Sequence, residues 1–284
     1  MRVAILGLGL IGGSLGLALK RKNWQSAEII GWVRRLETGQ AALKIKAIDA
    51  FELSLEKVVQ GTDIVLIATP VLAIKEIFYQ IAPHLQDNCI VTDVASTKLE
   101  VIRWAQELLP PKVSFLGGHP MAGKETFGLE AADANLFYGC VYCLVQGSHT
   151  SPTVMQIIKN MVETIGAIPL PIDAQEHDNL VAGISHLPLL LSAALVLATT
   201  KNTSWPQMSR LASSGYRDLT RLASGNPEMN ASICLTNQSS ILYWIDIFTE
   251  ELQKLRGLIG NNDTGIQNAL NIAKEARTKW LENH

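Results

Sequence analysis

The sequence predicts an α/β protein in two parts: a doubly wound parallel sheet over residues 1–172, followed by an all-α domain over residues 173–284. Three observations lead to this prediction. An apolar run at residues 3–6 ends in a glycine-rich turn, strand-like runs then alternate with helical patterns, and the pattern after residue 172 is almost entirely helical. Alternation of strands and helices is typical of a parallel sheet covered by helices on both faces. The domain boundary is expected near residues 171–174.

The elements follow in chain order. The clearest strand is IVLIAT, a continuous apolar run that ends at Pro70 and is typical of a parallel strand buried on both faces. Strands are expected at residues 3–6, 28–32, 64–69, 89–93, 113–117, 141–145 and 168–172. Helices are expected between them at residues 14–20, 37–46, 71–85, 99–109 and 152–165. The second half is expected to hold helices at residues 173–200, 205–213, 217–223, 227–258 and 262–283.

The turn after the first strand reads GLGLIGG and indicates a dinucleotide site. Gly7 allows the tight turn, Gly9 leaves room for the pyrophosphate, and Gly12 lets the helix pack closely on the strand. The amides of the first helical turn, at Leu10 and Ile11, would face the phosphates. Further cofactor contacts are expected from the ends of neighbouring strands, at Thr69, Pro70 and Ser96. The alternative is a glycine-rich turn that only packs.

The end of the second strand favours NADP(H) over NAD(H). An acid that would bind the ribose 2′-hydroxyl is expected there, but Val33 occupies its place and Arg34 and Arg35 follow. Two guanidinium groups would bind a 2′-phosphate that a carboxylate would repel. Alternatively, both arginines are solvated surface residues.

The composition limits the partners. A formal net charge of −2 and 48% hydrophobic residues indicate a globular protein that binds neither nucleic acid nor an anionic membrane. The first strand begins at residue 2, so no signal peptide is expected, and four irregularly spaced cysteines favour a reducing cytoplasm. Cys140 and Cys143 would point to opposite faces of a strand, so no metal site is expected. Residues 180–200 lack Asp, Glu, Lys and Arg and are long enough for a membrane span, but a buried helix in the centre of a helical domain or dimer is preferred.

Polar residues at the strand ends are the candidates for chemistry. His119 precedes Pro120, which favours extended backbone at that position, so the strand end would hold the imidazole rigidly as a base. Three more polar residues could equally have structural roles. Ser96 could cap the following helix, Arg217 could pair with Asp218, and His186 could bond backbone groups freed by Pro188.

Several motifs, in this order, resemble the prephenate/arogenate dehydrogenase family of tyrosine biosynthesis: GLGLIGGSLGLAL, DVASTK, GGHPMAGKE, HDNLVAGISHLP and GYRDLTR. The resemblance spans nearly the whole chain. It implies a Rossmann-type domain, a helical domain that forms a homodimer, and a small-molecule substrate, arogenate or prephenate. It further implies that hydride leaves C4 of a cyclohexadienyl ring while His119 takes the hydroxyl proton, and that loss of CO2 from C1 then makes the ring aromatic. Ser96 would bond the same hydroxyl and the cofactor ribose, Arg217 would bind the ring carboxylate, and His186 would also contact the substrate.

The chain departs from the family pattern at two places. Some members have a second histidine three residues after the histidine of HLP, where this chain has Leu189, and the acid that would bind the cofactor ribose is missing. The ammonium of arogenate calls for a nearby carboxylate or carbonyl, and Glu125 and Asp218 are candidates. With NADP(H), the combination resembles arogenate-specific members of the family more than prephenate-specific ones.

Two further functions stay open. One is that of another NADP-linked oxidoreductase, such as a β-hydroxyacid dehydrogenase or imine reductase, although these generally place a catalytic lysine in the helical domain. The other is that of a nucleotide sensor without catalysis, for which His119 would be dispensable.

Overall fold

The computed structural model describes residues 1–124, 126, 128–147 and 150–283. The chain forms two compact units, Met1–Gln238 and Ser239–His284. The first holds the sheet and the helices up to α11, and the second holds most of α12 (Gln238–Gly260) together with α13 (Gly265–Glu282). The two units meet after Gln238, later in the sequence than the predicted domain boundary. The division into domains after residue 172 stays a prediction.

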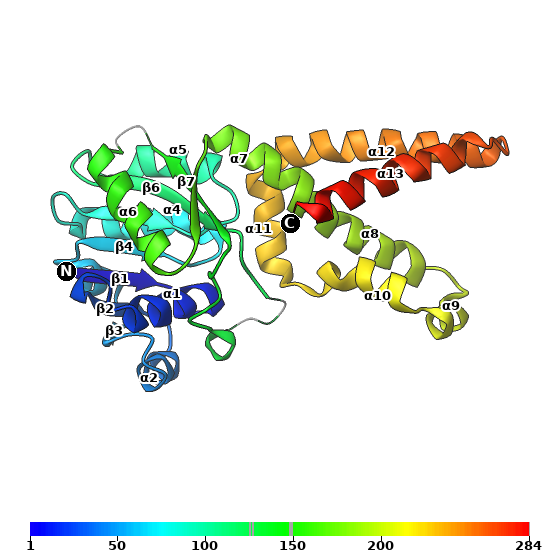
Figure 1. The fold of residues 1–284 in the computed structure, drawn as a ribbon. Helices are drawn as coiled ribbons and strands as arrows, with labels where there is room; N and C mark the ends of the chain where they lie inside the picture. The colour runs from blue at the N-terminus through cyan, green and yellow to red at the C-terminus, as the bar shows by residue number, and fades with distance from the viewer. Residues whose placement is uncertain (125, 127, 148–149, 284) are drawn as a thin grey trace. The chain divides into compact units, whose positions relative to one another are not determined.

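An eight-stranded sheet forms the centre of the first unit (Figure 1). Its strands lie in the order β3-β2-β1-β4-β5-β6-β7-β8, and every neighbouring pair is parallel except β6 with β7. The strands are β1 (Arg2–Leu6), β2 (Glu28–Trp32), β3 (Ala50–Glu52), β4 (Ile64–Ile67), β5 (Ile90–Asp93), β6 (Ser114–Pro120), β7 (Val141–Gln146) and β8 (Ile168–Pro171). The predicted fold class is thereby confirmed. The sequence prediction missed β3, which has only three half-buried residues.

Both faces of the sheet are covered, which explains why residues 3–6 of β1 are all apolar. Val3 and Ile5 belong to one core cluster and Ala4 and Leu6 to the other, all fully buried. Successive side chains of a strand point to opposite faces, so neither face can be polar. The helices of this half are α1 (Leu10–Arg21), α2 (Leu36–Lys44), α3 (Leu55–Val59), α4 (Val71–Ile81), α5 (Leu99–Leu108) and α6 (Pro152–Thr164).

The strand β7 runs against the direction of β6, which differs from the expected all-parallel sheet. An antiparallel neighbour needs no crossover helix, and the connection between them holds only a short 3₁₀ turn, Leu129–Ala131, within its described residues. This connection packs on α1, where the amide of Asp133 donates to Ser14 Oγ at 2.9 Å. Because β6 is parallel to β5, His119 still lies at the edge of the sheet where the parallel strands end.

The predicted helix at residues 173–200 is interrupted in its middle. It consists of α7 (Ala174–Val181), a π-helical segment (Ala182–His186) and α8 (Leu187–Thr200). Pro188 in the first turn of α8 has no amide hydrogen to donate, and a π turn immediately precedes it. The following elements are α9 (Trp205–Leu211), α10 (Ser214–Thr220), a 3₁₀ turn (Arg221–Ser224) and α11 (Pro227–Thr236). The single helix predicted at residues 227–258 was wrong, because Asn237 leaves helical geometry between α11 and α12.

The apolar segment is not buried within one chain. Ala174–Thr200 is the one helical stretch among the described residues with the length and hydropathy of a membrane span, and 28% of its most apolar window is buried. A core helix of a soluble protein meets the same criteria. Within α8 only Leu187 and Ser192 are buried, so the expectation of a buried helix is not met by a single copy of the chain.

Candidate active site

The glycine-rich turn has the geometry that close approach of a ligand requires. Gly7 has a φ of 103°, and a Cβ there would lie 2.7 Å from the carbonyl oxygen of Ala68. A Cβ on Gly12 would lie 2.0 Å from the carbonyl oxygen of Gly7. A Cβ on Gly9, in contrast, would meet no atom within 4 Å. Gly7 and Gly12 are therefore required by the fold itself, whereas Gly9 borders open space.

A cavity of about 340 Å³ begins at this turn. Six of the residues predicted to bind the cofactor line it: Gly9, Leu10, Ile11, Thr69, Pro70 and Ser96. No side chain caps the start of α1, so the amides of its first turn are directed to a ligand or to solvent. The buried hydroxyl of Thr69 has no partner in the described part of the chain. These features fit a dinucleotide, whose phosphates and sugars would supply the missing acceptors.

The two arginines after β2 lie at the surface. Val33 is buried, and Arg34 and Arg35 are exposed, with Arg35 immediately before α2. Within the described residues neither guanidinium makes a hydrogen bond or ion pair, so both are available for an anionic ligand.

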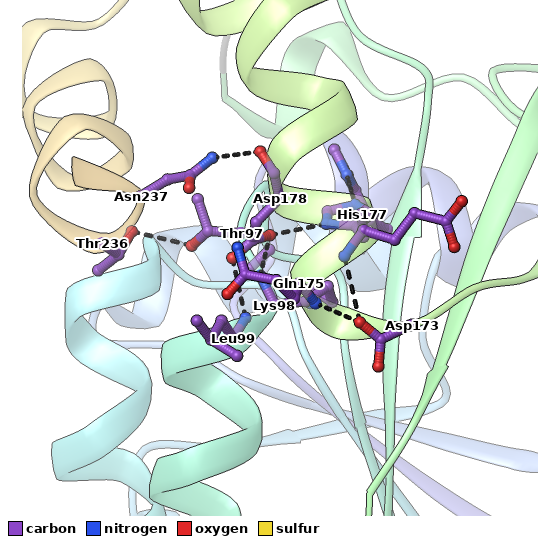
Figure 2. A network of polar contacts seen from close by, with 12 residues as sticks. Thr97, Lys98, Leu99, Asp173, Gln175, His177, Asp178, Thr236 and Asn237 are labelled. Atoms are coloured by element: carbon purple, nitrogen blue, oxygen red, sulfur yellow. Dashed lines mark hydrogen bonds and ion pairs between the residues drawn. The ribbon is translucent and has the colours of Figure 1, made fainter. Parts of the chain in front are cut away.

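Ser96 does not cap α5, which removes its proposed structural role. The carboxylate of Asp178 caps that helix instead: its Oδ1 accepts from the amide of Lys98 at 2.7 Å and its Oδ2 from the amide of Leu99 at 2.9 Å (Figure 2). Ser96 is free to face the cavity from the loop after β5.

His119 lies at the end of β6 and is 9% exposed. Its Nδ1 is 2.9 Å from Nε2 of His177, and Nδ1 of His177 is 2.7 Å from Oδ1 of Asp178. Burial, with His177, Lys98 and His186 nearby, holds the pKa of His119 well below its ordinary value. The imidazole is therefore neutral at physiological pH, as a base must be.

A buried ion pair holds the backbone next to His119 by hydrogen bonds. Lys98 and Asp93 are both fully buried and form an ion pair. Lys98 Nζ also donates to the carbonyl oxygen of Gly118 at 2.7 Å, directly before His119, and Asp93 Oδ1 accepts from the amide of Gly118 at 3.1 Å. Burial lowers the pKa of Lys98, and Asp93 opposes that shift.

His186 belongs to the same cluster. It is 2% exposed, and its Nδ1 lies 3.2 Å from Nδ2 of Asn237, which also donates to the carbonyl oxygen of Asp178 at 2.7 Å. Because an amide nitrogen only donates, Nδ1 of His186 accepts and Nε2 carries the proton. That Nε2 is buried and has no partner in the described part of the chain. Burial lowers the pKa of His186 to about 4.

Of the described residues predicted to bind the substrate or act on it, Ser96 lines the cavity, whereas His119 and His186 do not. Arg217 and Asp218 lie on α10, are exposed, and do not line it. Glu125 lies outside the described residues. Glu228, in the first turn of α11, does line the cavity, although its sequence context did not distinguish it.

The sequence prediction also missed the roles of His177, Asp178, Lys98 and Asp93. Acid, lysine and histidine within otherwise apolar segments could have indicated them, because buried charges are rare unless paired. The sequence could not show which of these residues contact one another, because the hydrogen bond between Lys98 and Asp178 joins segments 80 residues apart.

Comparison with known proteins places this arrangement in a family. The family described as "Prephenate dehydrogenase, nucleotide-binding domain" matches residues 15–169, and "Prephenate dehydrogenase, dimerization domain" matches residues 173–271. The chain belongs to the prephenate dehydrogenase family.

Individual relatives and solved structures support the same family assignment. The prephenate dehydrogenase of Bacillus subtilis (strain 168) is 36% identical over 92% of this chain and 71% of its own length. The crystal structure of Synechocystis arogenate dehydrogenase matches with a TM-score of 0.84 and 32% identity, over 99% of this chain and 100% of that one. Prephenate dehydrogenase from A. aeolicus, in complex with hydroxyphenyl propionate and NAD⁺, matches with a TM-score of 0.91 and 27% identity, over 98% of both chains.

Family membership settles the general chemistry. The chain is an oxidoreductase of aromatic amino acid biosynthesis with a Rossmann-type nucleotide-binding domain, and it acts on a small molecule. The prephenate dehydrogenase family includes relatives named for prephenate and for arogenate, so the substrate of this member has to be inferred from its own residues.

Proposed function

We propose that the protein oxidatively decarboxylates arogenate to tyrosine with NADP⁺. The observation that carries the proposal is that β6 holds a buried imidazole, His119, near its end, and that the neighbouring strand β5 is followed by Ser96, which lines the cavity. A neutral base held at the carboxyl edge of a nucleotide-binding sheet is suited to alcohol oxidation.

The chain's own residues account for the proton. His119 takes the proton of the C4 hydroxyl as the C4–H bond gives up its electron pair, and Ser96 holds the same hydroxyl by a hydrogen bond. A bound nicotinamide supplies the acceptor for the hydride. The ketone formed at C4 then receives the electron pair of the breaking C1–carboxylate bond, CO2 leaves, and protonation of the C4 oxygen completes the phenol ring.

Support for NADP⁺ comes from the end of β2. No acid stands at residues 33–35, directly after Trp32, and the exposed guanidinium groups of Arg34 and Arg35 have no partner in the described part of the chain. A 2′-phosphate would give them charge-assisted hydrogen bonds. The glycine turn, the uncapped first turn of α1 and the hydroxyl of Thr69 would hold the rest of the dinucleotide.

Support for arogenate is electrostatic. An ammonium on the substrate side chain requires a carboxylate near it, and Glu228 is the one carboxylate among the described residues that line the cavity. Glu125 and Asp218 stay candidates for the same role, and Arg217 stays the candidate for the ring carboxylate. His186, whose buried Nε2 has no partner in the described part of the chain, stays a candidate for contact with the substrate.

A homodimer formed through the helical domain is part of the proposal. The exposed apolar side chains of the 174–200 stretch, such as Ile184 and Leu197, need a cover that one chain does not provide. A second copy would provide it, in a soluble cytoplasmic enzyme.

The test is turnover of the purified protein with each of the four combinations of arogenate or prephenate with NADP⁺ or NAD⁺. Arogenate with NADP⁺ should give the highest kcat/KM and release tyrosine. The second candidate, prephenate with NAD⁺, is favoured by the relatives named for prephenate and by the NAD⁺ complex. A higher kcat/KM for that pair would replace the proposal, and no turnover with any pair would remove the reaction altogether.

A further inference from the structure

Three side chains form a line of hydrogen bonds that ends at the proposed base. Asp178 and His177 are neighbours on α7, and His119 comes from β6. The exposed fractions are 1% for Asp178, 1% for His177 and 9% for His119. The two contacts, 2.7 Å and 2.9 Å long, join the three groups without an intervening solvent molecule.

The backbone at the start of α5 determines which atoms carry protons. Both oxygens of Asp178 accept amide hydrogens, Oδ1 from Lys98 and Oδ2 from Leu99 (Figure 2). A carboxylate only accepts hydrogen bonds, so Nδ1 of His177 donates to Oδ1. With a single ring proton, placed on Nδ1, His177 offers only a lone pair at Nε2, which leaves Nδ1 of His119 as the donor in the next contact. The lone pair of His119 is consequently on Nε2.

Three other charged or titratable groups lie near the hydrogen-bonded series Asp178–His177–His119. Lys98 from the start of α5, Asp93 from β5 and His186 from the π segment lie around His119 and His177. The lysine is already bonded to Asp93 and to the carbonyl of Gly118, and His186 is bonded to Asn237. Because these groups have partners of their own, none of them competes with Asp178 for Nδ1 of His177.

We infer that His177, anchored by Asp178, is a positioning residue: it holds His119 as the Nδ1–H tautomer, so that Nε2 is the atom that accepts the substrate proton. Without these hydrogen bonds either nitrogen of His119 could carry the hydrogen. In the form that carries it on Nε2, that atom has no lone pair and cannot accept the substrate proton. The inference rests on the proposed function only for its effect on catalysis, since the tautomer itself exists without substrate.

A pair of substitutions at position 177 separates positioning from packing. In His177→Gln the amide group can donate to Asp178 and accept from His119, whereas His177→Leu can do neither. We expect His177→Leu to lower kcat/KM by about 10²-fold, within the range that a general base contributes, and His177→Gln to restore most of that loss. Affinity for NADP⁺ should stay unchanged in both, and His84→Leu, at a partly exposed histidine outside the cluster, serves as the matched control.

The tautomer is measured directly by NMR of protein with ¹⁵N-labelled histidines. The ring signals of His119 are assigned by their loss in His119→Gln. The wild-type protein should show the proton on Nδ1 of His119, and His177→Leu should show a mixture of tautomers.

Each of these measurements has a result that would overturn the inference. A proton on Nε2 of His119 in the wild type would overturn the inference, as would wild-type kcat/KM in His177→Leu or equal losses in the Leu and Gln variants. If the wild type turns over no substrate, the proposed function fails while the NMR spectrum still decides the tautomer.

Discussion

The glycine turn between β1 and α1 and the histidine cluster at the end of β6 are built in different ways. The turn consists of six consecutive residues whose positions are set by backbone geometry, with Gly7 and Gly12 packed against main-chain atoms. The cluster gathers side chains from β5, β6, α5, α7 and the segment after α11, and hydrogen bonds hold it together. A larger residue in the turn should therefore destabilise the fold by steric overlap. A substitution in the cluster should instead disturb which atoms carry protons, while the fold persists.

The largest expected effect is at Gly12. A Cβ there would lie 2.0 Å from the carbonyl oxygen of Gly7, so Gly12→Ala must displace backbone and should cost about 3 kcal/mol or more of unfolding free energy. Gly9→Ala meets no atom and should unfold like the wild type while losing affinity for NADP⁺, because its methyl group enters the space reserved for the cofactor. Denaturant unfolding and cofactor titration distinguish the two. Equal stability losses in both variants would contradict the assignment of open space at Gly9.

At the cluster, His119→Gln should show the opposite behaviour. Removal of a general base lowers kcat by roughly 10²–10⁴-fold, while the affinity for NADP⁺ and the unfolding midpoint should change little, since glutamine retains polar atoms in the same place. Steady-state kinetics and cofactor titration measure both. If kcat falls by less than a factor of about three, another group takes the proton, since a true base contributes far more.

The contrast between these two regions also explains what could be predicted from sequence. The glycine spacing in GLGLIG and the apolar strands specify a nucleotide-binding sheet from residues that are adjacent in the chain. The proline after His119 predicted the extended backbone that β6 has at this position. The partners of His119 were not predictable, because the hydrogen bonds to His177 and from Lys98 to Asp178 depend on packing between distant segments. The cap of α5 shows the same limit: Ser96 had the right type and nearly the right place, yet a carboxylate from α7 took the role.

An intermediate effect tests the cofactor edge away from the glycines. Arg34→Ala should weaken NADP⁺ binding about 10-fold, as expected for one charge-assisted hydrogen bond, and leave NAD⁺ binding unchanged. Titration with both cofactors provides the comparison, and Arg103→Ala, at an exposed arginine of α5, is a matched control for the loss of a surface cation. Equal losses for both cofactors would place Arg34 near the shared part of the dinucleotide and would remove the argument for a 2′-phosphate.

The smallest effect concerns acid stability and belongs to the cluster alone. The pKa of His186 is about 4 in the folded protein, whereas an unfolded histidine has its ordinary value near 6.5. Between these values the unfolded chain binds a proton that the folded protein does not, so stability is lost as pH falls from about 6.5, at up to ~1.4 kcal/mol per pH unit. His119, whose pKa is also lowered, adds to the loss. Denaturant unfolding at several pH values between about 5 and 6.5 should give a shallower slope for His186→Gln than for the wild type. Gly9→Ala should keep the full slope, because the glycine turn contains no group that titrates. Parallel slopes in all three proteins would show that His186 does not contribute to the loss of stability in acid.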